Sequence, residues 1–248
     1  VRRGAASGKM RPKIYLFGDS ITESSFSEGG WGASLANHFA RTADVVLRGY
    51  SGYNTRWAVR VCEKVFPPSE ADSGESTLAV TVFFGANDAS IADRYSGFQH
   101  VPLDEYKRNL GSIVSIFKKR WPEALILVIT PPPVDEEARL LYPYVDNPVN
   151  LPERTNDAAG AYAKTCVEAA NESGCPVIDL WTTMQDSPDW RRTFLSDGLH
   201  LTAAGNQVVF REVVKKLREN GLNPEKLPVD LPLLSEIDHA DPTKSFPN

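Results

Sequence analysis

The chain has little cysteine and little histidine, and this scarcity narrows the classes of protein to which it can belong. Its 248 residues include three cysteines and four histidines. Cys62, Cys166 and Cys175 are odd in number and show no C-x-x-C spacing, so the sequence predicts neither a disulfide framework nor a zinc site. Cys62 and Cys166 fall in amphipathic helical patterns, where we expect buried free thiols, and this usage is typical of a reducing compartment.

Long apolar runs and clustered positive charge are also missing. No segment approaches the roughly 18 apolar residues of a membrane-spanning helix. The net charge is −5 and the basic residues are scattered, which argues against nucleic acid or an anionic membrane as a partner. Residues 1–10, VRRGAASGKM, have no apolar centre and are not a secretory signal, so we interpret them as a flexible extension or a tag remnant. We therefore expect a soluble, cytoplasmic protein.

What the sequence does contain is an alternation of short apolar runs and longer amphipathic segments. The runs predict parallel strands covered on both faces, at 13–18, 44–49, 78–85, 124–130 and 176–180. The amphipathic segments predict helices at 31–42, 55–66, 103–120, 154–173 and 203–220. This alternation predicts an α/β fold, a three-layer α/β/α sandwich with a five-stranded parallel sheet. We expect one domain over 11–223 and a proline-rich acidic tail, 224–248, packed on or near it.

Residues capable of chemistry follow four of the five predicted strands. Ser20 comes directly after the first strand, Gly52 after the second and Asn87 after the third. Asp197 and His200 come after the fifth strand and a short helical stretch. Because ligands of open parallel sheets bind beyond the carboxyl ends of the strands, we expect all five residues at one edge.

This set of groups meets the needs of acyl transfer. A serine hydroxyl such as that of Ser20 is a poor nucleophile until a base takes its proton, and His200 is the candidate base. Asp197 can fix the tautomer of the imidazole and stabilise its developing charge. The backbone N–H groups of Ser20 and Gly52, with the side-chain amide of Asn87, can donate to a tetrahedral oxyanion.

Other interpretations stay open at this point. Taken singly, these residues can be a helix cap, a turn glycine, an Asx turn or a structural histidine. The hydroxyl-rich stretch GDSITESSFS is compatible with a flavodoxin-like ligand-binding module, which leaves Asn87, Asp197 and His200 without a task. GD and GAND partly match motifs of metal-dependent phosphoesterases. A metal site of that kind needs several histidine and carboxylate ligands, and His200 is the only candidate nearby.

Four short motifs resemble those of a known superfamily in order and spacing. FGDSIT, GYSGYNT, FFGAND and SDGLH resemble the four blocks of the SGNH, or GDSL, hydrolases. RGYSGYNTRWA, VPLDEY, RTND and LSDGLHL resemble more closely the isoamyl acetate-hydrolysing esterases, over about residues 11–220. The leucine of the GDSL motif is replaced by Ile21, an aliphatic side chain for an aliphatic one.

The resemblance implies a role for each of the five strand-end residues. It implies Ser20 as nucleophile, His200 and Asp197 as the rest of a triad, and Ser20, Gly52 and Asn87 as oxyanion donors. It also implies a flavodoxin-like sheet, no metal or other cofactor, and a small-molecule ester as substrate. The expected activity is hydrolysis of short-chain, acetate-type carboxylic esters through an acyl-enzyme.

Residues beside the motifs are candidates for the walls of a substrate pocket. These candidates are Asp19, Trp31, Tyr53 and Phe84. We expect the loops 91–101 and 131–153 to complete the walls. The stretch PPPVDEEARLLYPY, residues 131–144, is open to interpretation as a lid or as an oligomer contact, so a homo-oligomer is possible.

Overall fold

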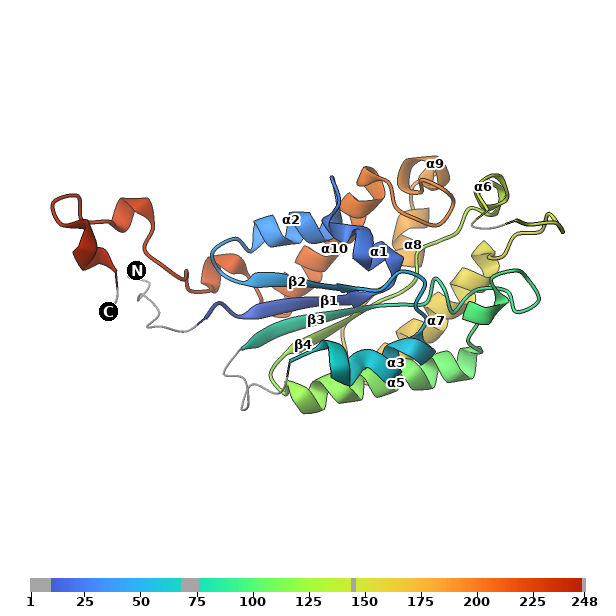
Figure 1. Cartoon of the computed structure of the whole chain (residues 1–248), viewed down its shortest axis with the longest axis horizontal. Coiled ribbons are helices and arrows are strands. Elements are labelled where there is room, and N and C mark those ends of the chain that lie inside the picture. Colours follow the sequence, from blue (N-terminus) through green and yellow to red (C-terminus); the bar gives the residue numbers. More distant parts are fainter. Residues whose placement is uncertain (1–9, 68–75, 144–145, 247–248) are drawn as a thin grey trace.

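The centre of the protein is a sheet of five parallel strands, as the sequence predicts (Figure 1). The structure is a computed structural model that describes residues 10–67, 76–143 and 146–246. The strands follow the order β2-β1-β3-β4-β5. They are β1 (Lys13–Gly18), β2 (Asp44–Gly49), β3 (Thr77–Phe83), β4 (Leu125–Ile129) and β5 (Val177–Ile178). β5 is shorter than predicted because Asp179 already caps the next helix, where its side chain accepts from the Thr182 N–H.

Long helices cover both faces of the sheet, which confirms the three-layer prediction (Figure 1). One face carries α3 (Thr55–Val65), α5 (Leu103–Arg120) and α7 (Asn156–Glu172). The other carries α2 (Trp31–His38) and α10 (Ala203–Glu219). All five long helices were predicted, with ends shifted by a few residues. For example, α7 begins two residues late because the Thr155 hydroxyl caps it, accepting from the Ala158 N–H at 3.1 Å.

Apart from the short helical stretch expected between the fifth strand and Asp197, the short helices were not predicted, because four to six residues are too few to show a helical period. They are α1 (Ser20–Glu23), α6 (Glu136–Leu141), α8 (Leu180–Gln185) and α9 (Trp190–Phe194). Turns of 3₁₀ helix occur at Ser24–Phe26, Gly97–Gln99, Pro224–Lys226, Leu234–Glu236 and Pro242–Ser245. Figure 1 shows α1, α6 and α9 toward the carboxyl edge of the sheet, where the site described below lies.

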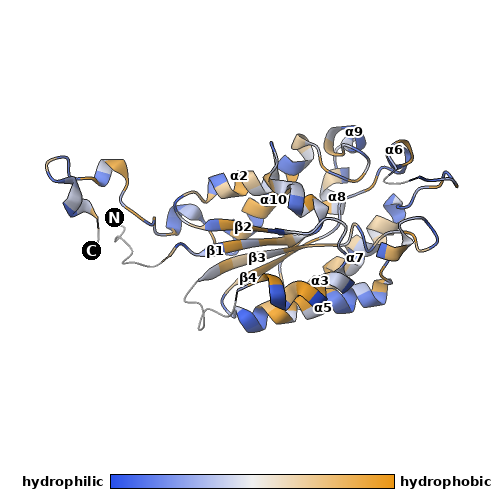
Figure 2. Cartoon of the chain, viewed as in Figure 1, coloured by the Kyte–Doolittle hydropathy of each residue, from blue (hydrophilic) through white to orange (hydrophobic). Residues whose placement is uncertain are grey.

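The two faces of the sheet bury different kinds of side chain. Along β1, Tyr15 and Phe17 point to the α3 and α5 side, whereas Ile14 and Leu16 point to the α2 and α10 side. Each of these four side chains is at most 1% exposed, so each contributes about 1.5–3 kcal/mol by leaving water. The first side is rich in aromatic rings, and Phe17 meets the edges of Phe66, Phe84 and Phe117. Figure 2 shows the apolar colouring of the strands between these layers.

The C-terminal tail leaves the domain at the amino ends of the strands (Figure 1). Asp230 ties its start to the domain, accepting from Arg41 Nε at 2.9 Å and from Arg11 Nε at 3.1 Å. The later part extends away from the sheet, with Leu234 largely exposed. The domain limits at 11 and 223 stay a prediction, and the predicted extension 1–10 lies outside the described residues except for Met10.

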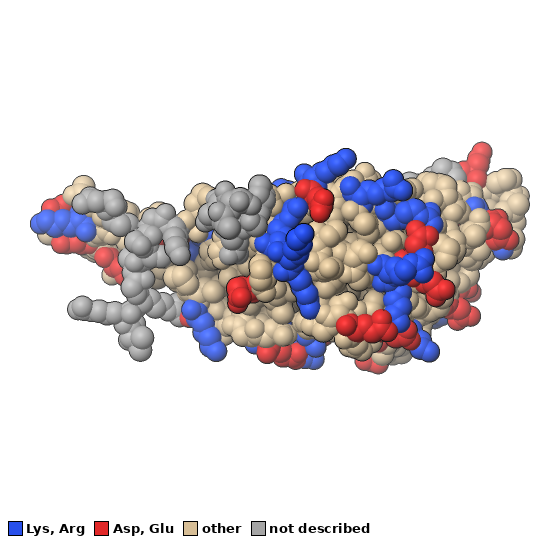
Figure 3. Space-filling view, turned by 90° about the horizontal axis from the view of Figure 1, so that it is seen from below, with Lys and Arg blue, Asp and Glu red and all other residues tan. Residues whose placement is uncertain are grey.

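The outer surface carries mixed charge. On the face seen from below, lysine and arginine side chains are interspersed with aspartate and glutamate (Figure 3). In the part of the chain that the structure describes, no helix has the length and apolar character needed to cross a membrane.

Candidate active site

Ser20 lies at the abrupt turn from β1 into α1. The Asp19 side chain caps this helix, because its Oδ1 accepts from the Ile21 N–H at 3.0 Å. Gly18 makes the tight turn possible, since a Cβ there would lie 2.1 Å from Thr22 Oγ1 and 2.6 Å from the Phe83 carbonyl oxygen. Ser20 is thereby held as the first residue of a helix at the carboxyl edge of the sheet.

His200 and Asp197 come together on one turn before α10. The carboxylate of Asp197 accepts from the backbone N–H groups of Leu199 and His200, at 3.0 and 2.7 Å, which folds the turn around it. His200 Nδ1 lies 2.8 Å from Asp197 Oδ2, and His200 Nε2 lies 3.0 Å from Ser20 Oγ. A proton on Nδ1 satisfies the carboxylate and leaves Nε2 free to accept from the serine hydroxyl. The three side chains form one hydrogen-bonded chain.

The electrostatic environment of Asp197 favours its charged form. Burial by itself would raise the pKa of this carboxyl. Hydrogen bonds from the ring and the backbone of His200 outweigh that effect and hold its pKa well below the usual range. Asp197 is therefore a carboxylate at neutral pH, able to stabilise a positive imidazole.

Asp19, next to Ser20, shows the opposite behaviour. It is 1% exposed, and burial raises its pKa to about 7 against the lowering effect of the Ile21 hydrogen bond. A carboxyl group so far removed from water is held mainly neutral below that pH. Its place is that of a buried helix cap rather than of a pocket wall.

Gly52 and Asn87 complete the site from the loops after β2 and β3. Gly52 has a φ of +78°, a left-handed conformation that favours glycine. Asn87 is 4% exposed, and its Nδ2 donates to the Tyr53 carbonyl oxygen at 2.9 Å. Since an amide nitrogen carries two hydrogens, one remains for a ligand in the cavity that Asn87 lines.

A cavity of about 360 Å³ opens over these groups. Ser20, His200, Gly52 and Asn87 all line it. Most of the remaining wall is aromatic or amide-bearing and is made by Tyr53, Trp57, Tyr95, Phe98 and Gln99. A volume at the low end of the usual range for ligand sites suits a small substrate.

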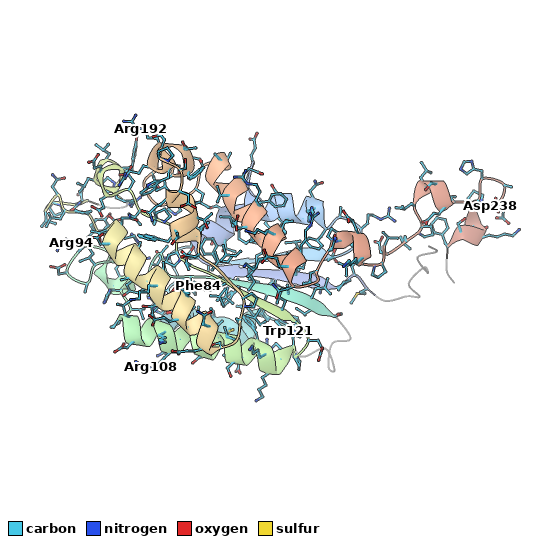
Figure 4. The ribbon with its side chains drawn as sticks, turned by 180° about the vertical axis from the view of Figure 1, so that it is seen from behind. Phe84, Arg94, Arg108, Trp121, Arg192 and Asp238 are labelled. Atoms are coloured by element: carbon cyan, nitrogen blue, oxygen red, sulfur yellow. The ribbon has the colours of Figure 1, made fainter. Side chains whose placement is uncertain are left out.

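Three of the four predicted wall residues do not line this cavity. Tyr53 does, whereas Asp19, Trp31 and Phe84 are buried elsewhere. Trp31 turns into the core beneath α2, and its Nε1 donates to the Ile21 carbonyl oxygen at 3.3 Å. Phe84 packs in the aromatic core, with its ring centroid 4.8 Å from that of Phe17, between the sheet and helices α5 and α7 (Figure 4). Nearness in sequence misled here because neighbouring residues point to different layers.

Sequence reasoning missed several residues that shape the site. Trp57 and Phe98 both line the cavity and stack on each other with ring centroids 6.4 Å apart, and Phe98 belongs to the 91–101 loop that was expected to form a wall. The described part of 131–153 lines none of the cavity but sends Arg139 inward, where Nη1 donates to Asp197 Oδ2 at 3.0 Å. Arg154, from the RTND motif, lines the cavity beside Asn87. The sequence signal for Arg154 was its place in RTND, a motif of the closer family likeness, and Arg139 lies in the stretch 131–144, where no residue was given a role in the site.

The described residues do not supply the set of ligands that a metal-dependent phosphoesterase needs. Over residues 10–67, 76–143 and 146–246, no three histidine, cysteine, aspartate or glutamate side chains gather as a metal would require.

Comparison with known proteins fits this geometry. Residues 16–208 match the model of the GDSL-like lipase/acylhydrolase family. The chain belongs to this family. The SGNH/GDSL resemblance is confirmed, and with it the general activity of an esterase or acylhydrolase acting on small molecules.

Relatives within the GDSL family support the finer likeness. A GDSL esterase/lipase from Arabidopsis thaliana is 63% identical over 237 residues, covering 96% of this chain and 98% of the relative. The isoamyl acetate-hydrolyzing esterase 1 homolog of Homo sapiens is 41% identical over 244 residues, covering 98% of this chain and 95% of the relative. The crystal structure of a lipase/acylhydrolase from Enterococcus faecalis has a TM-score of 0.64 at 25% identity, over 85% of this chain and 97% of that one. The family and its fold thus agree with the sequence-based prediction.

Proposed function

We propose that this GDSL-family protein is a serine esterase that works through an acyl-enzyme. The observation that carries the proposal is the chain from Ser20 Oγ to His200 Nε2, 3.0 Å, and from His200 Nδ1 to Asp197 Oδ2, 2.8 Å, at the wall of the cavity. Each contact lies within the range in which a base can take a proton and a carboxylate can orient that base.

In the proposed reaction, Ser20 Oγ forms a bond to the ester carbonyl carbon while its proton passes to His200 Nε2. The tetrahedral intermediate collapses, the bond to the alcohol oxygen breaks, and that oxygen takes the proton from Nε2. Water then repeats the sequence on the acyl-enzyme, releasing the carboxylic acid and restoring the serine. Asp197 holds the ring and stabilises its positive charge in both halves.

The backbone N–H groups of Ser20 and Gly52 and the amide of Asn87 are the proposed oxyanion donors. All three residues line the cavity. Donors fixed before the reaction stabilise the developing negative charge without having to reorganise.

The substrates that we propose are short-chain acyl esters, above all acetates of medium aliphatic alcohols. The cavity of about 360 Å³ supports a small acyl group, and the apolar wall of Tyr53, Trp57 and Phe98 suits the alkyl chain of the alcohol. Each methylene buried there contributes roughly 0.8 kcal/mol, so a longer alcohol should raise kcat/KM until the wall ends. The name of the human relative, isoamyl acetate-hydrolyzing esterase 1 homolog, agrees with this choice.

Covalent labelling tests the nucleophile. A fluorophosphonate should add one adduct to the intact protein, mapped by peptide mass spectrometry to the tryptic peptide that carries Ser20. Ser20→Ala should take up no label and retain the wild-type melting temperature. Labelling at another residue, or full activity in Ser20→Ala, would remove the serine mechanism from this site.

A substrate series tests the specificity. We expect kcat/KM to fall from p-nitrophenyl acetate to butyrate to octanoate, because overfilling a tight pocket typically costs about 1–3 kcal/mol. Among acetates it should rise from ethyl to butyl to isoamyl. A preference for octanoate over acetate would refute the small acyl pocket and leave the serine mechanism standing.

A further inference from the structure

Arg154 is a buried arginine whose hydrogen bonds converge on the proposed oxyanion side of the cavity. It is 4% exposed, and its guanidinium uses most of its donors on neighbouring groups. Nε donates to the Ala86 carbonyl oxygen at 2.8 Å, and Nη2 donates to Asn87 Oδ1 at 2.9 Å and to Gln99 Oε1 at 2.9 Å. One side chain therefore holds both the backbone and the amide of the GAND loop.

Gln99 supports the same amide from a different loop. Its Nε2 donates to Asn87 Oδ1 at 3.2 Å and to the Gly52 carbonyl oxygen at 2.9 Å. Its own orientation is fixed, since its Oε1 accepts from Arg154. Gln99 thus connects the two loops that carry Gly52 and Asn87.

These contacts allow only one orientation of the Asn87 amide. Oδ1 faces two donors, Arg154 Nη2 and Gln99 Nε2, while Nδ2 faces an acceptor, the Tyr53 carbonyl oxygen at 2.9 Å. A flipped amide would set its NH₂ group against two donors and its oxygen against a carbonyl oxygen, losing all three hydrogen bonds. The orientation that survives keeps the second Nδ2 hydrogen available to the cavity.

The arginine also leads to the triad through a buried carboxylate. Glu153 is 0% exposed, and its Oε1 accepts from Arg154 Nη1 at 2.9 Å and from Arg139 Nη2 and Nε at 2.7 and 2.9 Å. Arg139, 1% exposed, donates through Nη1 to Asp197 Oδ2 at 3.0 Å. This arginine–glutamate bridge (Arg139, Glu153 and Arg154) runs from the carboxylate beside His200 to the amide of Asn87. The bridge pairs opposite charges in a buried region, where an unpaired charge would strongly destabilise the folded protein.

We propose that Arg154 and Gln99 are positioning residues that fix the Asn87 amide as an oxyanion donor, and that Arg139 does the same for Asp197. This inference rests on the proposed serine-esterase function. None of the three arginine and glutamine side chains takes a proton or forms a bond in the reaction. Their effect passes through Asn87 and Asp197, which makes it measurable as non-additivity.

A double-mutant cycle tests the oxyanion half. Arg154→Lys keeps the charge beside Glu153 but loses the planar fork that reaches four partners. With p-nitrophenyl acetate we expect it to lower kcat about 10–100-fold, as misplacement of a catalytic group does, with KM changed less than about twofold. In the Asn87→Ala background the same substitution should change kcat by less than about twofold, because the group that it positions is gone.

Arg48→Lys is the matched control for this cycle. Arg48 is a half-buried arginine that donates to the carbonyl oxygens of Val65 and Leu47, both at 2.8 Å, away from the cavity. It should leave kcat unchanged in both backgrounds. If Arg154→Lys fails to fold by circular dichroism, Gln99→Met enters the same cycle, since it keeps the side-chain length and removes the hydrogen bonds.

The outcomes separate this inference from the proposed function. Suppose that Asn87→Ala lowers kcat strongly and that Arg154→Lys lowers kcat by the same factor in this background as in the wild type. Arg154 then does not act through Asn87, and the inference is overturned while the proposed function stands. If Asn87→Ala leaves kcat intact, the oxyanion role falls and the inference falls with it. A cycle that is non-additive as described supports both.

A second cycle tests the triad half with the same substrate. Arg139→Lys should lower kcat about tenfold in the wild-type background, with KM nearly unchanged, because Oδ2 of Asp197 loses its buried guanidinium donor. In the Asp197→Asn background it should change kcat by less than about twofold. Equal losses in both backgrounds would overturn the positioning role of Arg139.

Discussion

On the triad side of the cavity, Asp197 and His200 lie three residues apart on one turn, and the turn itself orients the carboxylate. On the oxyanion side, Gly52 and Asn87 come from separate loops. Gln99, which is 47 residues from Gly52, joins the two loops, and Arg154, which is 67 residues from Asn87, holds the Asn87 amide. The triad side is also more exposed, because His200 is partly exposed whereas Asn87 is buried. The triad side is therefore organised mainly by local hydrogen bonds, to which Arg139 adds one long-range donor, and the oxyanion side by long-range contacts of buried polar groups.

This difference indicates how each side should respond to substitution. On the triad side, changes remove the reacting groups themselves and need not disturb the rest of the fold. On the oxyanion side, changes act on groups held by several loops, so smaller losses of rate should come with measurable changes in stability.

The largest effect is expected for His200→Ala. Because serine and base act as a unit, its loss in kcat should equal that of Ser20→Ala, on the order of 10⁶-fold. Steady-state kinetics of both variants on p-nitrophenyl acetate provides the measurement, with His239→Ala in the tail as control. A His200→Ala enzyme with a large share of wild-type kcat would mean that another group serves as the base.

The next effect concerns Asp197→Asn, which keeps the shape but misdirects the tautomer. We expect kcat to fall by about 10⁴-fold with little change in KM. Asp179→Asn is a matched control, because Asp179 caps α8 through the same kind of side-chain contact and lies outside the cavity. A loss larger than that of His200→Ala would contradict the assignment of base and carboxylate.

The third prediction concerns Asn87→Ala, a substitution on the oxyanion side. It should lower kcat by about 10²–10³-fold and leave KM nearly unchanged, since the contact is made mainly in the transition state. Asn223→Ala, in an exposed turn, is the control. An increase in KM at constant kcat would instead make Asn87 a ground-state binder.

The pH dependence of stability separates buried carboxyls on the two sides. Burial raises the pKa of Asp88, next to Asn87, to about 7, although Thr55 hydrogen bonds lower it. Between about pH 4 and 7 the native state binds a proton that the unfolded chain has released, so the free energy of unfolding falls as the pH rises. This one group should account for roughly 2–4 kcal/mol across that window.

Urea denaturation of the wild type and of Asp88→Asn at pH 4.5, 6 and 8 provides the measurement. The variant should show a shallower fall, with the part due to Asp19 remaining, because its pKa is also raised to about 7. Asp197 has the opposite sign. Its lowered pKa contributes stability that is present above about pH 4 and lost only on further acidification. Identical slopes in the two proteins would exclude a raised pKa at Asp88.

The smallest effect is expected for Gly52→Ala. A Cβ at this position would lie 3.5 Å from Gln99 Nε2, an ordinary contact, so the cost is backbone strain of about 1–2 kcal/mol. Gly221→Ala is the matched control, with a φ of +86° and no atom within 4 Å of the added Cβ. Both should lose similar stability in thermal melts, while only Gly52→Ala should lower kcat, by less than about tenfold. An equal loss of kcat in both variants would contradict the role of Gly52 as an oxyanion donor.

Much of this protein could be predicted because its signals are local. The apolar runs of β1 to β4 and the amphipathic period of the five long helices each depend on a few consecutive residues. Ser20 and the Asp197–His200 pair follow directly from strand-end motifs. The wall residues Trp31 and Phe84 were predicted wrongly because the direction of a side chain next to a motif depends on which layer it faces.

The sequence by itself determined the order of the elements, the family and the edge of the sheet at which the reactive groups meet, because period, turn residues and motifs act over short stretches of chain. Only the tertiary structure decided what surrounds those groups. Arg139 and Arg154 read as ordinary surface arginines, yet they meet at Glu153, buried between the triad and the Asn87 amide. No local pattern encodes the contact of Arg139 with Glu153, since α6 must pack against the loop that carries Glu153 and Arg154 before the charges between them are buried.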